Sequence, residues 1–481
     1  MRRFVLWLLL LAGSLGAPVM AQRPDATTVR RAVASEVDRL SADIGRIAGT
    51  LWTYSETSLK EERSAALLAD LLEHEGFRVT RGAAGMPTAF VATWGSGKPV
   101  VGILAEYDAL PGIGNAAVPR KQPREDGVTA GQGCGHNVFG AGSVGAALAL
   151  KRAMADQRLP GTIKLFGTPA EETMIGKVYM ARDGVFDGLD AALEWHPGQE
   201  TEVGNTANQA MTSFTVEFFG QAAHAAADPW NGRSALHAVE LFTHGVNLMR
   251  EHVKPGARLH YVLQAGGDAP NVVPAYTKLW MYARDVDRPS VDAHLQWIGK
   301  IAEGAALATR TTHAITMITG GHEYLFNRPL QEAMQKNLDV VGAPAFEDAD
   351  QRFARELQRE AGVARDGLET SVGKLAPDVK PVEGGSTDVS EVSHLTPTVG
   401  LSVATVGKHL PWHGWAATAS HGTPAANRGA IVAAKVIALT ALDLLTQPAL
   451  LDQARADFVK RTGGKPYASP IPARQKPPIP K

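Results

Sequence analysis

The chain has 481 residues, of which 44% are hydrophobic and 20% charged, and its formal net charge is −1. This length and apolar content suffice for one large globular domain and a second smaller one, and they exclude a disordered or fibrous chain. A charge balance so close to neutral provides no basic field to attract a phosphate backbone, so we expect no nucleic-acid partner. Chemistry on a small molecule is the default expectation.

The first residues have the pattern of a secretory signal peptide. Arg2 and Arg3 precede an apolar run over residues 4–15, and residues 19–21 offer a small-residue cleavage site, so residues 1–21 are the predicted signal peptide. An uncleaved membrane anchor is the alternative, but the run is shorter than the about 20 apolar residues that a membrane span needs. We therefore expect an exported protein, periplasmic or secreted, with no stable membrane insertion after cleavage.

Helical and strand-like patterns alternate along the first part of the chain. Two successive helical patterns lie between residues 25 and 74, strands are predicted at residues 89–93, 100–104, 162–166 and 191–195, and helices at residues 138–155 and 175–183. Alternation of this kind predicts an α/β fold with a mainly parallel sheet and helices on both faces. We assign residues 22–205 to the first part of a catalytic domain.

The pattern changes after Gly204. Strands at residues 213–219, 259–264, 278–286 and 314–318 and helices at residues 235–252 and 291–308 follow in the order β-α-β-β-α-β. This order is typical of the ferredoxin-like fold. Because the earlier pattern resumes after His322, we interpret residues 206–319 as an inserted α+β domain and residues 320–465 as the second part of the catalytic domain. Residues 466–481, rich in Pro and Lys, are predicted to be disordered.

Candidate metal ligands follow three strands of the predicted sheet. Cys134, the only cysteine, and His136 lie in a glycine-rich turn before a helix; Glu171 and Glu172 follow a second strand; His196 ends a third. Each motif alone is better explained as an inert buried cysteine, an acidic helix start or a strand-end histidine. Their joint position at one sheet edge, where α/β sheets bind ligands, favours a site for Zn²⁺ or a similar divalent ion. One carboxylate could then bind metal while its neighbour transfers protons.

Five motifs together resemble the metallopeptidase family of aminoacylase, hippurate hydrolase and the plant auxin-conjugate amidohydrolases. They are LAEYDALP at residues 104–111, GCGHN at 133–137, PAEE at 169–172, EWHP at 194–197 and GQAAHAA at 220–226. The resemblance covers nearly the whole chain after the predicted signal peptide, in the family's order. It implies one or two divalent ions, Zn or Mn, bound by Cys134, His136, Glu172 and His196, with Glu171 as general base and acid.

The family also has a last histidine ligand near the C-terminus, where this sequence departs from the family's usual His-x-Pro-x-Phe motif. His409, His413 and His421 all lie between a predicted strand at residues 399–406 and a helix that begins near Arg428. The resemblance favours His413, because relatives place this ligand soon after the strand. His421 is the second choice.

The resemblance further implies that residues 206–319 form a lid and dimerisation domain. His224 would polarise the scissile carbonyl or stabilise the oxyanion, in many relatives across the dimer interface, and Asn271 would contact the substrate. An interface histidine without catalytic duty is the alternative for His224. Gly385 and Ser386 belong to a glycine-rich loop whose backbone groups could bind a substrate carboxylate.

The resemblance implies hydrolysis of the amide bond of an N-acyl amino acid or dipeptide by metal-activated water, with p-aminobenzoyl-glutamate-like substrates favoured. A dipeptidase or a general aminoacylase is one alternative. A non-catalytic partner subunit that keeps the fold is another, but the presence of Glu171 with its neighbouring ligands argues against it. We expect a homodimer or a pair with a related subunit.

Overall fold

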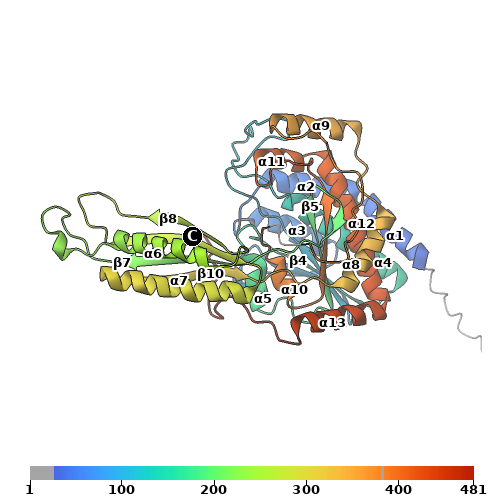
Figure 1. The fold of residues 1–481 in the computed structure, drawn as a ribbon. Coiled ribbons are helices and arrows are strands. Elements are labelled where there is room, and N and C mark those ends of the chain that lie inside the picture. The colour runs from blue at the N-terminus through green and yellow to red at the C-terminus, as the bar shows by residue number, and fades with distance from the viewer. Residues whose placement is uncertain (1–25, 381–383, 481) are drawn as a thin grey trace, which may run out of the picture.

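The protein consists of a large α/β domain from which a smaller, elongated domain projects (Figure 1). The computed structural model describes residues 26–380 and 384–480. The predicted signal peptide therefore lies outside the described residues.

A seven-stranded sheet forms the centre of the large domain, in the order β1-β2-β4-β3-β5-β11-β6. Its strands are β1 (Arg78–Arg81), β2 (Phe90–Ser96), β3 (Val100–Ala105), β4 (Gly161–Gly167), β5 (Ala191–Gly198), β6 (Glu202–Val203) and β11 (Thr398–Ala404). The four central strands β4, β3, β5 and β11 are parallel, whereas β1, β2 and β6 pair antiparallel at the edges. The prediction of a mainly parallel α/β sheet is confirmed.

The central strands are buried along nearly their whole length, which requires cover on both faces of the sheet. α4 (His136–Gln157) and α12 (Pro424–Thr446) pack against each other and against these strands. A Cβ atom at Gly142 of α4 would lie 3.0 Å from the Trp195 ring and 3.1 Å from the Ala430 carbonyl oxygen, so this close approach depends on glycine. α12 is long and apolar enough to cross a bilayer, but 78% of its most apolar window is buried, as in the core helix of a folded domain.

The remaining helices of the large domain surround this core. They are α1 (Ala26–Arg39), α2 (Ser41–Tyr54), α3 (Glu62–His74), α5 (Gly176–Arg182), α8 (Arg328–Val341), α9 (Asp348–Glu360), α10 (Val389–Ser393), α11 (Trp415–His421) and α13 (Pro448–Thr462). Three helices, α1 to α3, occupy the segment where two helical patterns were expected. Leu40, between α1 and α2, keeps nearly helical backbone angles, so the sequence pattern runs through the break.

The small domain contains β7 (Ala210–Phe219), α6 (Ala235–Met249), β8 (Arg258–Ala265), β9 (Tyr276–Asp285), α7 (Arg288–Thr309) and β10 (Thr312–Gly321). Its antiparallel sheet has the order β10-β7-β9-β8, which is the ferredoxin-like arrangement predicted from the sequence. α6 and α7 pack on this sheet over a core that includes Phe214, Phe242 and Ile298. This domain therefore has a hydrophobic core of its own.

The C-terminal segment, residues 466–480, is ordered where the sequence predicted disorder. Ile471 is buried, Tyr467 donates a hydrogen bond to Glu391, and the Gln475 amide donates to the carbonyl oxygens of Met317 and Ile318 at 2.8 and 2.9 Å. The composition of this segment does not predict its order, because a few contacts of single side chains hold it in place and it has no periodic apolar pattern. The segment joins the large domain to β10 of the small domain.

Candidate active site

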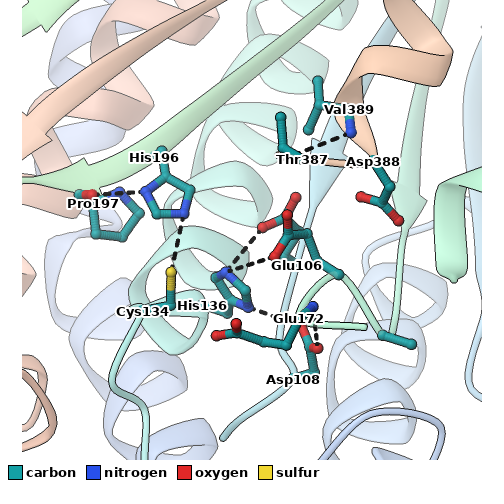
Figure 2. A network of polar contacts seen from close by, with 12 residues as sticks. Glu106, Asp108, Cys134, His136, Glu172, His196, Pro197, Thr387, Asp388 and Val389 are labelled. Atoms are coloured by element: carbon teal, nitrogen blue, oxygen red, sulfur yellow. Dashed lines mark hydrogen bonds and ion pairs between the residues drawn. The ribbon is translucent and has the colours of Figure 1, made fainter. Parts of the chain in front are cut away.

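The carboxyl ends of the parallel strands bring the predicted ligands to one edge of the large sheet, as expected for an α/β fold. Glu106 and Asp108 follow β3, Glu171 and Glu172 follow β4, and His196 lies near the end of β5, while Cys134 and His136 stand at the start of α4. Gly135 at this start has φ 81°, a left-handed conformation that suits glycine. Figure 2 shows how the side chains cluster, and it labels Glu106, Asp108, Cys134, His136, Glu172 and His196.

Asp108 fixes the ring of His136. Its Oδ1 atom lies 2.8 Å from His136 Nδ1, and its Oδ2 atom accepts the backbone N–H of Glu172 at 3.0 Å. His136 Nε2 therefore faces the site, 3.2 Å from Glu106 Oε2 and 3.9 Å from Glu171 Oε2. Burial alone would raise the pKa of Asp108, but the contact with His136 and its hydrogen bonds lower it. A carboxylate in this position typically orients a ligating histidine.

Cys134 and His196 form the second part of the cluster, with 3.5 Å between Sγ and Nε2. His196 Nδ1 lies 2.7 Å from the carbonyl oxygen of Pro197, which leaves Nε2 directed at the site (Figure 2). Burial lowers the pKa of His196 to about 4, so its ring is neutral and can donate a lone pair. Burial and the nearby Glu172 raise the pKa of the Cys134 thiol, an effect that a bound cation would reverse.

Glu171 and Glu172 diverge from one another. Glu172 Oε2 lies 3.5 Å from His413 Nε2, while Glu171 faces His136 and Glu106. Burial raises the pKa of Glu172 to about 8, and burial together with Glu106 raises the pKa of Glu171 well above its usual range. The two adjacent carboxyl groups therefore lie in different parts of the cluster.

The donor set fits a divalent metal ion. Three groups of side chains each bring their ligand atoms within 4.8 Å of one another: Cys134, His136 and His196; Cys134, Glu172 and His413; and Glu106, His136 and Glu171. His136 Nε2 and Glu172 Oε1 are buried without a hydrogen-bond partner, which costs free energy unless another group satisfies them. Thiolate, imidazole and carboxylate donors together suit Zn²⁺ or a similar ion.

The three C-terminal histidines take different positions. His413 lies beside Glu172 with a half-exposed side chain. His421 is buried, its Nδ1 lies 2.9 Å from the Gln132 carbonyl oxygen, its Nε2 lies 3.2 Å from Thr405 Oγ1, and its ring stacks on Trp412. His409 pairs with Asp366 at the surface. Of the three, His413 belongs to a group of possible ligands.

Behind the cluster, the buried ammonium of Lys177 joins two carboxylates that the sequence analysis did not assign. Lys177 Nζ lies 2.7 Å from Glu106 Oε1 and 2.6 Å from Asp388 Oδ1, and the Lys177 backbone N–H donates to Asp388 Oδ2 at 2.8 Å. Burial alone would lower the pKa of Lys177, but Asp388 and Glu106 raise it, so the ammonium stays charged. Glu106 lies inside the quoted LAEYDALP motif, and the polar residues of that motif were the available signal.

A cavity of about 450 Å³ opens beside the cluster, where the two domains meet. The large domain contributes Glu171, Glu172, His196, Gly385 and Ser386, and the small domain contributes Met211, Tyr282 and Arg284. Gly385 and Ser386 therefore line the cavity as the resemblance implied. Arg284 was missed, because an arginine inside an apolar strand pattern gives no signal of its own.

His224 and Asn271 are not brought to this cavity within one chain. Both are exposed and lie in loops at the end of the small domain remote from the large one, where Ala225 N–H donates to the Asn271 carbonyl oxygen at 3.0 Å. His224 Nδ1 accepts N–H groups of Ala226 and Ala227. The structure places them beside each other and away from Glu171.

Fold and site together define a metal-dependent hydrolase built on an α/β domain with an inserted ferredoxin-like domain. The model of the peptidase family M20/M25/M40 matches residues 102–411, and the chain belongs to this family. It is a metallo-amidohydrolase whose substrate is a small-molecule amide, and the family and donor set support a divalent metal ion as cofactor.

The chain is 36% identical over 470 residues to one of the subunits of p-aminobenzoyl-glutamate hydrolase from Escherichia coli, covering 92% of this chain and 97% of that protein. It is 30% identical to the Xaa-Arg dipeptidase of Mus musculus, over 89% of this chain and 92% of that protein. Among solved structures, a dinuclear metal-binding M20 peptidase from Bacillus subtilis shares the fold, with a TM-score of 0.55 at 18% identity, covering 83% of this chain and 99% of that chain.

We expect Lys177→Met to destabilise the protein by about 3–5 kcal/mol, because it leaves the Glu106 and Asp388 carboxylates buried without a countercharge. Chemical unfolding followed by tryptophan fluorescence measures the change. Lys300→Met, which removes an exposed ammonium on α7, is the control and should shift stability by at most about 0.5 kcal/mol. Equal unfolding midpoints for the two variants would show that the buried contacts of Lys177 contribute nothing to stability.

We expect His413→Ala to lower metal affinity far more than His421→Ala or His409→Ala, because it removes a candidate ligand beside Glu172. A residue that only orients a ligand costs about 10- to 100-fold in affinity. Titration of all three variants with Zn²⁺ under one buffer tests the ranking. If His421→Ala has the largest effect, the ligand lies later in the chain than the resemblance favours.

Proposed function

We propose that the protein hydrolyses N-acyl amino acids of the p-aminobenzoyl-glutamate type. The main support for this proposal is the position of Glu171, which lies within the cluster of candidate ligands and lines the same cavity as Arg284. Arg284 is the one Lys or Arg among the described residues that line this cavity. A guanidinium there can bind a carboxylate through two parallel hydrogen bonds. The relationship to the Escherichia coli p-aminobenzoyl-glutamate hydrolase over most of both chains supports this substrate class.

In the proposed reaction, a water molecule adds to the amide carbon, the C–N bond breaks, and a carboxylic acid and an amine leave. Glu171 accepts a proton from the attacking water and returns it to the nitrogen of the leaving amine. Arg284 holds the amino-acid carboxylate, and Asp108 keeps His136 in one orientation. A bound ion would act as a Lewis acid toward the carbonyl and lower the pKa of water.

The proposed cofactor is Zn²⁺ or Mn²⁺, one or two ions per chain. Cys134, His136, Glu172, His196 and His413 would hold it, since these residues provide overlapping ligand groups that share Cys134. A thiolate ligand favours Zn²⁺, and the carboxylates also suit Mn²⁺. Release of glutamate from an acyl-glutamate by protein loaded with each ion, compared with acyl-glycine and β-alanyl dipeptides, tests the activity and the metal together.

We expect Glu171→Gln to keep its metal content but to lose several orders of magnitude in turnover, because the amide keeps the shape of the side chain and cannot carry protons. Glu172→Gln is the matched variant and should lower metal occupancy itself. Elemental analysis and initial rates on the same samples separate the two effects. A loss of less than about tenfold in Glu171→Gln would contradict its assignment.

We further propose that the small domain pairs with a second copy or a related subunit, which brings His224 to the neighbouring active site to stabilise the oxyanion. His224 and Asn271 sit far from the cavity of their own chain, and the edge strand β8 exposes Tyr261, Val262 and Leu263. An unpaired edge with apolar side chains readily pairs with another chain. A dimer would bury this surface.

Mixing two inactive variants tests this arrangement. A mixed dimer of Glu171→Gln and His224→Ala contains one site with Glu171 from one protomer and His224 from the other. Random exchange of protomers should then recover about a quarter of the wild-type activity, because half of the dimers are mixed and each has one intact site of two. If His224 acts within its own chain, or in no catalytic role, mixing restores nothing beyond the separate activities.

We also propose export to the periplasm or the medium, because residues 1–21 have the charge and apolar pattern of a signal peptide. Fractionation of expressing cells and N-terminal sequencing of the mature chain test this. A protein retained in the cytoplasm with residues 1–21 intact would contradict it.

A further inference from the structure

Several buried polar atoms around the cavity at the domain junction lack hydrogen-bond partners. Among the described residues, such atoms include Asn208 Nδ2, Arg284 Nε, Tyr324 Oη and Ser386 Oγ, and all four residues line the cavity. Buried polar groups in folded proteins are normally paired, and each unpaired one costs free energy. Their concentration around one cavity indicates a ligand that supplies the missing acceptors.

Asn208 and Tyr324 are held together where the chain passes between the two domains. Asn208 lies on the connector that leads into β7, Tyr324 lies on the connector that leaves β10, and the Tyr324 backbone N–H donates to Asn208 Oδ1 at 2.6 Å. Next to them, the Gln209 N–H donates to the Gly385 carbonyl oxygen at 2.9 Å, beside Ser386. Three separate segments thus meet and present their free polar atoms at the same place.

The hydrogen bond from Tyr324 settles the orientation of the Asn208 amide. Its oxygen is occupied as an acceptor, so only the NH₂ group of Asn208 remains free. The Arg284 guanidinium and the NH₂ group of Asn208 can only donate hydrogen bonds. The hydroxyl groups of Tyr324 and Ser386 can donate hydrogen bonds as well as accept them. A carboxylate, which only accepts hydrogen bonds, fits these groups, whereas the NH₂ group of a carboxamide or an ammonium or guanidinium group would place donors against donors.

The donors exceed the needs of one carboxylate. A guanidinium carries five N–H donors, an amide two and each hydroxyl one, while a carboxylate accepts about four hydrogen bonds. Arg284 has no acidic partner among residues 26–380 and 384–480. With Arg284 holding the main-chain carboxylate in the proposed function, the amide of Asn208 and the hydroxyl of Tyr324 remain for a second acidic group.

We propose that Asn208 and Tyr324 are specificity residues that bind the side-chain carboxylate of a dicarboxylic amino acid in the leaving half of the substrate. The proposal rests on the proposed hydrolysis of N-acyl amino acids and names the amino acids that the site selects. It requires a preference for N-acyl-glutamate or N-acyl-aspartate over the matching amides, which have the same shape but lack the charge.

One feature of the cavity favours the opposite specificity. The carboxyl group of Glu194 also lines it and could bind a cationic side chain, and the relatives include Xaa-Arg dipeptidases. Glu194 lies at the floor, against the backbone of Gly400 in β11, and has no ion-pair partner among the described residues. Substrates that end in glutamate, glutamine or arginine therefore distinguish the two specificities.

The experiment compares kcat/KM of the metal-loaded protein for p-aminobenzoyl-glutamate, p-aminobenzoyl-glutamine and p-aminobenzoyl-arginine. We expect the wild-type protein to prefer glutamate to glutamine by at least about tenfold. Tyr324→Phe should reduce this preference by about 10-fold, mostly through KM, because one hydrogen bond to the carboxylate is lost while ring packing remains. Tyr54→Phe, which removes a hydroxyl on α2, is the control and should leave the preference unchanged.

Asn208→Asp provides a second, nearly isosteric test, because an aspartate can still accept the Tyr324 N–H but introduces a negative charge. We expect Asn208→Asp to lower kcat/KM for p-aminobenzoyl-glutamate further than Tyr324→Phe does. It should also raise kcat/KM for p-aminobenzoyl-arginine relative to that for p-aminobenzoyl-glutamate. Binding of free glutamate and glutamine, as product inhibitors, gives a readout separate from turnover. Equal rates for glutamate and glutamine, or a preference for arginine that neither variant changes, would overturn this inference alone. Failure to hydrolyse any of the three substrates would overturn the proposed function.

Discussion

The buried ammonium of Lys177 is the contact on which the site depends. The sheet edge brings Glu106, Asp108, Glu171 and Glu172 close together, and burial destabilises the anionic forms of Glu171 and Glu172. Lys177 offsets part of that charge and links the end of β3 to Asp388, just before α10. A buried positive charge held by two carboxylates costs desolvation and is stable only with good geometry. The front of the cluster, where Cys134 and His136 lie, is also lined by the carboxyl groups of Glu171 and Glu172, which can attract a cation.

The junction between the domains has two roles at once. The connectors that carry the chain into and out of the small domain also supply cavity residues, and Asn208 and Tyr324 are bonded across them. The Thr319 hydroxyl at the end of β10 donates to the carbonyl oxygen of Met174, in the turn that follows Glu171 and Glu172. Any change in the angle between the domains therefore moves Arg284 relative to Glu171 on the opposite side of the junction. The shape of the cavity and the position of the domains are therefore linked in this fold.

The sequence predicted the α/β class, the ferredoxin-like insert and the position of the candidate ligands at one edge of the sheet, because periodic apolar patterns and the parallel geometry of the sheet constrain where strand ends meet. Its limits have physical causes. Lys177 and Asp388 stand 211 residues apart in the chain, so nothing local marks them as a pair. The order of residues 466–480 comes from contacts of single side chains such as Gln475, which composition does not encode. His224 and Asn271 lie at the end of the small domain remote from the cavity, and this distance is set by the length and direction of the inserted strands, which no local motif marks.

The insertion of the small domain has a consequence for folding. β11 lies between β5 and β6 in the large sheet, yet its residues come after the whole inserted domain. During synthesis the contiguous strands and helices of residues 210–321 can pack as soon as they emerge, whereas the sheet of the large domain has to wait for residues 398–404. Until then, the edge of β5 that later pairs with β11 has no neighbouring strand, and the candidate ligand His196 lies on this strand. The nascent chain thus passes through a stage in which its smaller domain is complete and its catalytic sheet is open, which is the period when chaperones would have the most to bind.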